Sequence, residues 1–121
     1  MSIRWYEYSK CSTCVKAKSL IKNTDLRIEY IDITTNPPTI EELKMMLDIY
    51  QGELRRLFNV SGEMYRLLKI KDTLKSMTID QALELLSQNG KLIKRPFVVA
   101  GENSFVGFNQ TTIESLCNNN P

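Results

Sequence analysis

Apolar positions near the start of the chain follow two different periods. Residues 3–8 are mostly β-branched and aromatic, which is typical of a strand. After a small polar loop, Cys14, Ala17 and Ile21 recur at helical spacing with lysines between them, which predicts an amphipathic helix. A second strand is predicted within residues 26–34. In this order the elements predict a right-handed β-α-β unit with parallel strands.

The stretch that follows keeps a helical period as far as Asn89. Pro37 and Pro38 precede a pair, Thr39 and Glu42, that has the spacing of a capping box. A helix is therefore predicted to begin directly after Thr39.

The last helix of this stretch has signals at both ends. Thr78 and Gln81 are spaced to cap its start, and Asn89-Gly90 predicts a C-cap at its end. The lysines that precede it are interpreted as a solvated face: Lys69, Lys71 and Lys75.

The C-terminal part returns to strands. Residues 97–108 predict a hairpin with a turn at 101–103, and a final amphipathic helix follows. The order β-α-β, helices, β-β-α predicts an α/β fold with a thioredoxin- or glutaredoxin-like core, a mixed four-stranded sheet and an inserted helical subdomain. We expect one domain, residues 1–121, whose core comprises 1–37 and 91–117 and whose helical insertion comprises 38–90.

Composition narrows the choice of chemistry. The 121 residues suit a single domain, and 16 Lys and Arg against 14 Asp and Glu leave a charge of only +2. We therefore expect neither direct nucleic-acid binding nor a membrane partner. No apolar run approaches membrane length, so a cytoplasmic location is expected. The absence of histidine excludes imidazole bases and histidine-containing metal sites.

Cys11 and Cys14 are the candidate reactive groups. Cys11 is expected at a strand-to-helix junction, where backbone N–H groups and the positive end of the helix stabilise a thiolate. Lys10 and Lys16 favour the thiolate weakly, and Cys14, about one turn further on, is expected to resolve a disulfide on Cys11. The pair forms a C-x-x-C motif beside a β-α-β unit, which favours redox chemistry.

Two other interpretations of the cysteines stay open. One is a zinc site and the other is a pair of unrelated thiols, although zinc prefers four ligands and the third cysteine, Cys117, is distant in sequence. Cys117 lies on the apolar side of the last helix and is interpreted as a small buried hydrophobe. We expect no metal and no bound cofactor.

Arg95-Pro96 immediately precedes the third predicted strand. In a thioredoxin-like core a proline here is typically cis and faces the reactive cysteine. Arg95 would then project into the site, where a guanidinium can stabilise the Cys11 thiolate and bind an oxyanion through paired hydrogen bonds. The alternatives are a strand-start proline and a solvated surface arginine.

Several blocks resemble the arsenate reductase/Spx family in sequence and order. They are Tyr8-Ser9-Lys10-Cys11-Ser12-Thr13-Cys14, Leu57-Phe58-Asn59-Val60-Ser61-Gly62-Glu63, Lys94-Arg95-Pro96 and Val106-Gly107-Phe108. The resemblance implies a glutaredoxin-like core with a helical insertion, a reactive Cys11 and an active-site Arg95. It also gives supporting positions to Ser12, Thr13, Asn59 and Pro96.

The chain departs from the glutathione- and glutaredoxin-linked arsenate reductases of that family. Those enzymes surround a single catalytic cysteine with three arginines and lack a cysteine at the position of Cys14. Here Arg95 matches one arginine, while the other two positions fall on Asn59 and close to Gly107. Arginines elsewhere in the predicted insertion could compensate: Arg55, Arg56 and Arg66.

Three functional hypotheses follow, all in a bacterial cytoplasm. The first is an arsenate-reductase-like thiol oxidoreductase that uses the Cys11/Cys14 dithiol, with thioredoxin, glutaredoxin or glutathione as reductant. The second is an Spx-type redox-sensing regulator that binds the RNA polymerase α subunit. The third is a genuine glutathione- or glutaredoxin-linked arsenate reductase.

Overall fold

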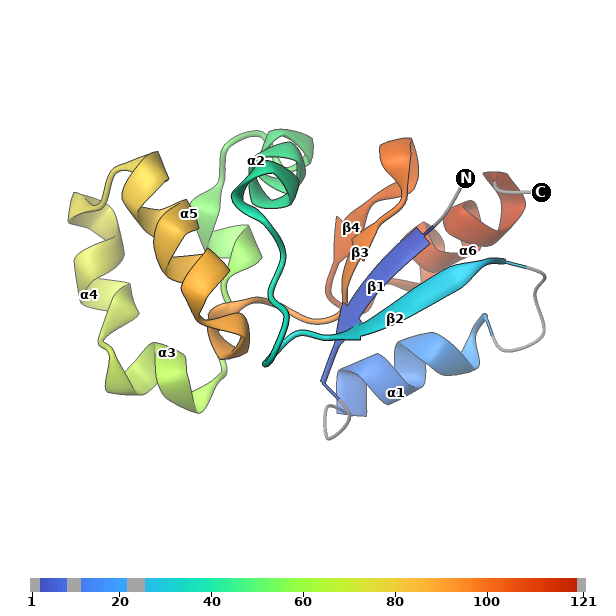
Figure 1. The fold of residues 1–121 in the computed structure, drawn as a ribbon, viewed down its shortest axis with the longest axis horizontal. Helices are drawn as coiled ribbons and strands as arrows, with labels where there is room; N and C mark the ends of the chain where they lie inside the picture. Colours follow the sequence, from blue (N-terminus) through green and yellow to red (C-terminus); the bar gives the residue numbers. More distant parts are fainter. Residues whose placement is uncertain (1–2, 9–11, 22–25, 120–121) are drawn as a thin grey trace. The chain divides into compact units, whose positions relative to one another are not determined.

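The computed structural model describes residues 3–8, 12–21 and 26–119 of the chain (Figure 1). It contains two compact units, one formed by residues 1–32 and 95–121 and the other by residues 33–94. We call them the sheet unit and the helical unit. The expected boundaries of the core and the insertion stay predictions. That the two make a single domain stays a prediction.

Four strands form the mixed sheet that the sequence predicted. They are β1 (Ile3–Glu7), β2 (Ile28–Asp32), β3 (Phe97–Val99) and β4 (Phe105–Val106). Their order in the sheet is β2-β1-β3-β4. β1 runs parallel to β2 and antiparallel to β3, and β3 runs antiparallel to β4. The sheet therefore joins the N-terminal and C-terminal parts of the chain through the β1–β3 pair.

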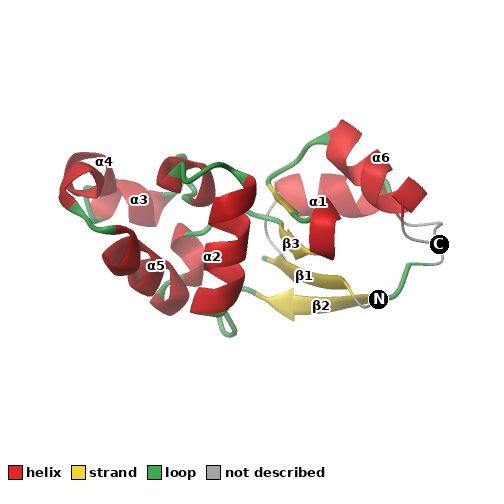
Figure 2. Ribbon diagram, turned by 90° about the horizontal axis from the view of Figure 1, so that it is seen from above, coloured by secondary structure: helices red, strands yellow, loops and turns green. Residues whose placement is uncertain are grey.

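Two helices, α1 (Ser12–Ser19) and α6 (Gln110–Asn119), pack on one face of this sheet (Figure 2). The strands send alternate side chains to that face, because successive residues of a strand point to opposite sides. The resulting core is made of buried apolar residues from β1, α1, β3, β4 and α6 and from the positions just after α1 and β3: Ile3, Trp5, Ala17, Ile21, Val98, Ala100, Phe105, Ile113 and Leu116. Trp5 is the only tryptophan of the chain and is fully buried there.

The helical unit contains α2 (Ile40–Ile49), α3 (Glu63–Leu67), α4 (Ile70–Thr73) and α5 (Ile79–Gln88). Both predicted capping boxes are confirmed. The Glu42 amide donates to Thr39 Oγ1 at 3.2 Å and the Thr39 amide donates to Glu42 Oε1 at 3.0 Å. Thr78 and Gln81 make the same reciprocal pair at 3.1 and 2.9 Å. Each pair satisfies two N–H groups that the first turn leaves unpaired.

The stretch between α2 and α5 is more broken than its helical period indicated. Two 3₁₀ turns, η1 (Leu54–Leu57) and η2 (Leu74–Ser76), flank the short helices α3 and α4. Lys69, between α3 and α4, has a φ of 52° in the left-handed region, which interrupts the helix. Periodicity detects the apolar face of such a stretch but not a single residue that turns the backbone.

The end of α5 corrects one detail of the prediction. Asn89 is the C-cap, but Gly90 does not adopt the left-handed conformation of a capping glycine and instead begins the 3₁₀ turn η3 (Gly90–Leu92). A Cβ on Gly90 would overlap the carbonyl oxygen of Ile33. The glycine is therefore needed for a close backbone approach.

No helix in the described part of the chain combines the length and the apolar composition needed to cross a membrane.

Candidate functional site

The C-x-x-C motif is described from its second residue onward. α1 begins at Ser12, which is exposed, and continues through the half-buried Thr13 to Cys14, which is only 1% exposed. Cys14 and Ala17 form the buried side of the helix. Lys10 and Cys11 lie outside the described residues, so their predicted roles stay predictions.

Burial decides what Cys14 can react with. A thiol that is 1% exposed is shielded from dissolved oxidants and from other proteins. Its place in the first turn of α1 puts it three positions after Cys11 in sequence. Cys14 therefore suits a reaction with a neighbour within the chain rather than with an external partner.

Arg95 and Pro96 begin the second half of the sheet unit. The peptide bond between them is cis, the form expected for Pro96. Arg95 is half-buried, and its guanidinium carbon lies 5.1 Å from the centroid of the Tyr8 ring, a distance at which a cation and a ring attract. Arg95 is thus held against an aromatic side chain and is not the fully solvated arginine of the alternative interpretation.

Sheet register explains why Arg95 meets Tyr8. Tyr6 on β1 pairs with Phe97 on β3, and the two strands are antiparallel. The residues after β1 and those before β3 therefore lie at the same end of the sheet. Tyr8 is three residues before Cys11 in sequence, so Arg95 is placed where the chain leaves β1 toward the dithiol motif.

Gly107 follows β4 at this end of the sheet. Its amide donates to the carbonyl oxygen of Pro96 at 2.9 Å, and its φ is 77°. Glycine adopts this left-handed conformation without the steric cost that a side chain would add. Next to it in sequence, the Phe108 ring lies 4.6 Å from Lys16 Nζ, so this lysine is also directed onto an aromatic face.

Asn59 belongs to the helical unit. Its amide donates to the carbonyl of Leu92 at 2.7 Å, and its side chain packs closely over Gly62. Arg55, Arg56 and Arg66 are exposed residues of the same unit, and the Arg56 guanidinium lies 4.7 Å from the Tyr50 ring centroid. The sheet unit thus holds Cys14, Arg95, Pro96 and Gly107, whereas Asn59 and these three arginines lie in the helical unit.

Cys117 is half-buried on α6 and packs against the core of the sheet unit. Burial raises the pKa of the Cys117 thiol, and the nearby Glu114 carboxylate raises it further. A raised pKa keeps the thiol protonated and unreactive, in agreement with its interpretation as a small hydrophobe. Among the described residues, no three Cys, Asp or Glu side chains gather to hold a metal ion.

Sequence reasoning missed the partner of Arg95. The sequence placed Tyr8 at the end of a predicted strand, residues 3–8, where an aromatic side chain usually packs on the sheet. The β1–β3 register could not be read from local sequence, so the contact between residues 8 and 95 carried no signal. Arg95 itself had two signals in the sequence, its place before a proline at a strand start and the family block Lys94-Arg95-Pro96.

Comparisons with known proteins agree over nearly the whole chain. A family model described as ArsC family matches residues 6–116. YusI, an uncharacterised protein of Bacillus subtilis, is 42% identical over 114 residues, which are 94% of this chain and 97% of YusI. The global transcriptional regulator Spx of Enterococcus faecalis is 25% identical over 108 residues, 89% of this chain and 80% of Spx.

Solved structures share the fold. An ArsC family related protein from Bacteroides fragilis has a TM-score of 0.87 at 36% identity, with 96% of this chain and 98% of that chain covered. A Streptococcus mutans protein described as a possible arsenate reductase has a TM-score of 0.81 at 38% identity, with 89% and 92% covered. The similarity extends over the sheet unit and the helical unit alike.

Proposed function

Since this chain belongs to the ArsC family, as its sequence blocks predicted, we propose that it is a thiol oxidoreductase that works through a Cys11/Cys14 dithiol. Cys11 is the nucleophile, Cys14 resolves the intermediate, and Arg95 stabilises the Cys11 thiolate. The reductant is a cellular thiol system: thioredoxin, glutaredoxin or glutathione. No bound cofactor takes part.

The observation that carries this proposal is the place of Arg95. Its guanidinium lies 5.1 Å from the ring centroid of Tyr8, at the end of the sheet from which the chain continues toward Cys11. A guanidinium stays protonated at any physiological pH and favours an anion beside it. The start of α1 adds its own partial positive charge. Both effects favour a thiolate over a thiol.

The proposed reaction is two thiol–disulfide exchanges. The Cys11 thiolate attacks one sulfur of a substrate disulfide, forms a mixed disulfide and expels the other sulfur as a thiolate. Cys14 gives its proton to that thiolate and attacks Cys11 Sγ, which closes the Cys11–Cys14 disulfide and releases the second substrate sulfur. Two electrons pass from the cysteine pair to the substrate, and the reductant returns them by the same exchange.

Mass spectrometry of acid-quenched samples from a series of glutathione redox buffers tests this proposal. We expect the mass of the chain to fall by that of two hydrogens when the internal disulfide forms. The Cys117→Ser control should show the same fall in mass. Cys14→Ser should accumulate one glutathione on Cys11, and Cys11→Ser should form neither product. A wild-type chain that carries only a glutathione adduct on Cys11 at every potential would contradict the dithiol mechanism. Full thiol-dependent turnover by Cys11→Ser would contradict the role of Cys11.

A second candidate function is redox-sensing regulation. It is favoured by the similarity to Spx, which covers 89% of this chain. In this alternative the Cys11–Cys14 state changes the affinity for the RNA polymerase α subunit, as the resemblance to Spx-type regulators implies. Retention of the purified chain on immobilised α subunit, compared between reduced and oxidised samples, tests it. No retention in either state would remove this candidate.

Genuine arsenate reduction is the third candidate, and the similar Streptococcus mutans protein is described as a possible arsenate reductase. An arsenate oxyanion needs several cations in its pocket, and of the three arginine positions only Arg95 carries one here. Gly107 holds a left-handed backbone instead of a side chain. We expect rates at background level when arsenate reduction is coupled to glutaredoxin or to thioredoxin. A rate well above background with either system would restore this function.

A further inference from the structure

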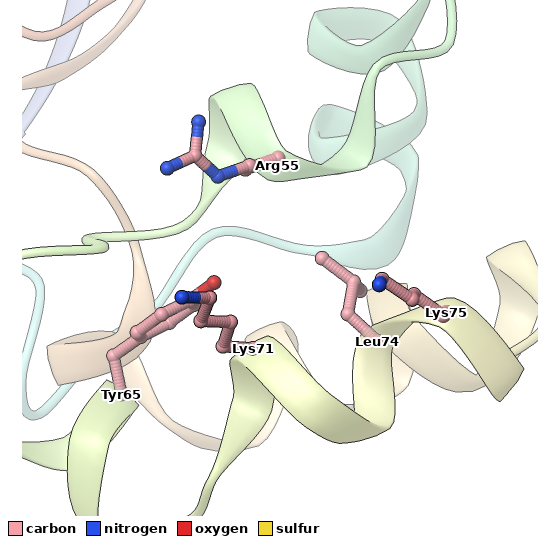
Figure 3. Close-up of a pocket in the computed structure, with 5 residues that line it drawn as sticks. All are labelled: Arg55, Tyr65, Lys71, Leu74 and Lys75. Carbon is pink, nitrogen blue, oxygen red and sulfur yellow. The ribbon is translucent and has the colours of Figure 1, made fainter.

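The helical unit contains a pocket that the thiol chemistry does not use (Figure 3). Its volume is about 320 Å³, and five residues line it: Arg55, Tyr65, Lys71, Leu74 and Lys75. Arg55 comes from η1, and the last three come from α4 and η2, which face it across the opening. This volume is at the lower end of the range for sites that bind small molecules, which begins at about 300 Å³.

Three of the five lining residues are cations. No carboxylate is among the described residues that line the pocket. Arg55, Lys71 and Lys75 also form no ion pair with any Asp or Glu in the described chain. The helical unit as a whole is nearly neutral, with nine Lys and Arg against eight Asp and Glu. The positive charge is therefore concentrated at this pocket and is not a general property of the surface.

The remaining two residues give the pocket an apolar side and a neutral donor. Tyr65 is 7% exposed, and its ring is fixed by an edge contact with Phe58 at 6.1 Å between centroids. A tyrosine so fixed presents its hydroxyl from a rigid position. Leu74 adds aliphatic surface next to Lys75, while Lys71 lies at the side of Tyr65. A ligand here would meet three cations, a tyrosine hydroxyl and apolar surface within one pocket.

From this arrangement we infer that the pocket binds a small organic dianion with a compact apolar body, either a phosphomonoester or a dicarboxylate. Two negative charges would relieve the mutual repulsion of the three cations. Arg55 offers paired hydrogen bonds to phosphate or carboxylate oxygens, and the lysines act as point charges. This site is separate in sequence and in structural unit from Cys14 and Arg95. It does not depend on the proposed oxidoreductase function.

Amide NMR titrations of the full chain test the inference with two matched probes, phenyl phosphate and phthalate. Two control probes are used. Inorganic phosphate lacks the apolar body, and benzyl alcohol lacks the negative charge. We expect saturable shifts of the pocket amides with at least one dianion and weaker binding of both controls. Tighter binding of phenyl phosphate assigns the phosphomonoester, and tighter binding of phthalate assigns the dicarboxylate.

Variants separate a built pocket from general charge attraction. Lys71→Gln removes one lining cation, and we expect about a fivefold weaker affinity for the dianion that binds. Tyr65→Phe removes the hydroxyl oxygen and keeps the packed ring. We expect it to weaken the affinity for the dianion about threefold. The matched control is Lys44→Gln, an exposed lysine of α2 outside the pocket, which should bind as the wild type does.

Two results would overturn the inference. One is the absence of saturable shifts at ligand concentrations on the order of tens of millimolar. The other is an equal loss of affinity in Lys71→Gln and Lys44→Gln, since that would mean unspecific attraction. The ligand-free spectrum of each variant is compared with that of the wild type. Chemical-shift differences confined to the substituted residue and its neighbours verify that the variant is folded.

Discussion

Arg95 is the residue on which the proposed thiol chemistry depends most. Its guanidinium is held 5.1 Å from the Tyr8 ring centroid, so it does not have to be ordered when a thiolate forms nearby. Arg95→Gln should slow alkylation of Cys11 by iodoacetamide about tenfold at neutral pH, because in the proposed mechanism the thiolate then loses its stabilising cation. The rate is followed by mass spectrometry of the Cys11 peptide.

The matched control for this variant is Arg27→Gln, an exposed arginine of the same unit. It removes the same charge at a distance and should leave the alkylation rate unchanged. Equal rates in wild type and Arg95→Gln would mean that Arg95 does not act on Cys11.

Tyr30 shows how neighbouring charges set an acid–base equilibrium on this sheet. Burial raises the pKa of Tyr30, Lys18 lowers it from 4.5 Å above the ring, and Glu7 raises it. Lys18 also pairs with Glu7 at 3.2 Å. We expect Lys18→Gln to raise the pKa of Tyr30 further and Glu7→Gln to lower it, measured by tyrosinate absorbance against a Tyr30→Phe reference.

The sign of the linked stability effect follows from the raised pKa. The folded chain favours the neutral phenol, so this contribution to stability is complete below the ordinary tyrosine pKa of about 10 and is lost as the pH rises through the raised value. Tyr30→Phe should therefore flatten the decline of stability at alkaline pH. If stability declined equally in Tyr30→Phe and the wild type, the decline at alkaline pH would come from other groups.

At the scale of elements, Gly90 follows the C-cap of α5 and begins η3 where the backbone approaches Ile33. A Cβ at this position would overlap the Ile33 carbonyl oxygen, and a backbone atom cannot move aside as a flexible side chain can. Gly90→Ala should lower the free energy of unfolding by about 2 kcal/mol or more, as overpacking does in a rigid site. Urea denaturation measures the loss.

Gly52→Ala provides a contrast within the same unit. No heavy atom lies within 4 Å of a Cβ placed there, but the φ of Gly52 is +81°. Gly52→Ala should therefore lower the free energy of unfolding only by the cost of alanine in the left-handed conformation, about 1 kcal/mol. A smaller loss for Gly90→Ala than for Gly52→Ala would show that the backbone at Gly90 adjusts freely.

At the scale of the whole molecule, the core of the sheet unit is assembled from both ends of the chain. Phe105 on β4 is 1% exposed and makes an edge contact with Trp5 on β1, with ring centroids 6.1 Å apart. Phe105→Ala should cost about 3 to 5 kcal/mol of unfolding free energy, because a large cavity would remain beside Trp5. Fluorescence of this single tryptophan reports the transition directly.

Val15→Ala is the control for that loss. Val15 lies in the same unit but is 60% exposed, so its truncation should change stability by less than about 0.5 kcal/mol. Similar effects of the two variants would mean that the core does not depend on the Trp5–Phe105 contact.

The sequence alone was sufficient for features whose cause is local. The two capping boxes join residues three positions apart, and the strands and amphipathic helices follow periods of two and 3.6 residues, so each was predictable from neighbouring positions. The order of these elements predicted the mixed sheet and the helical insertion, and the family blocks added the importance of Cys11, Cys14 and Arg95. The roles of these three residues stay predictions.

Tertiary structure decided what depends on distant parts of the chain meeting. The β1–β3 register brings Arg95 onto Tyr8, and folding of the helical unit brings Gly90 against Ile33. The same long-range packing places three exposed cations, Arg55, Lys71 and Lys75, along one pocket. Such contacts are selected by the packing of whole elements against each other, and this information is not contained in the local order of residues.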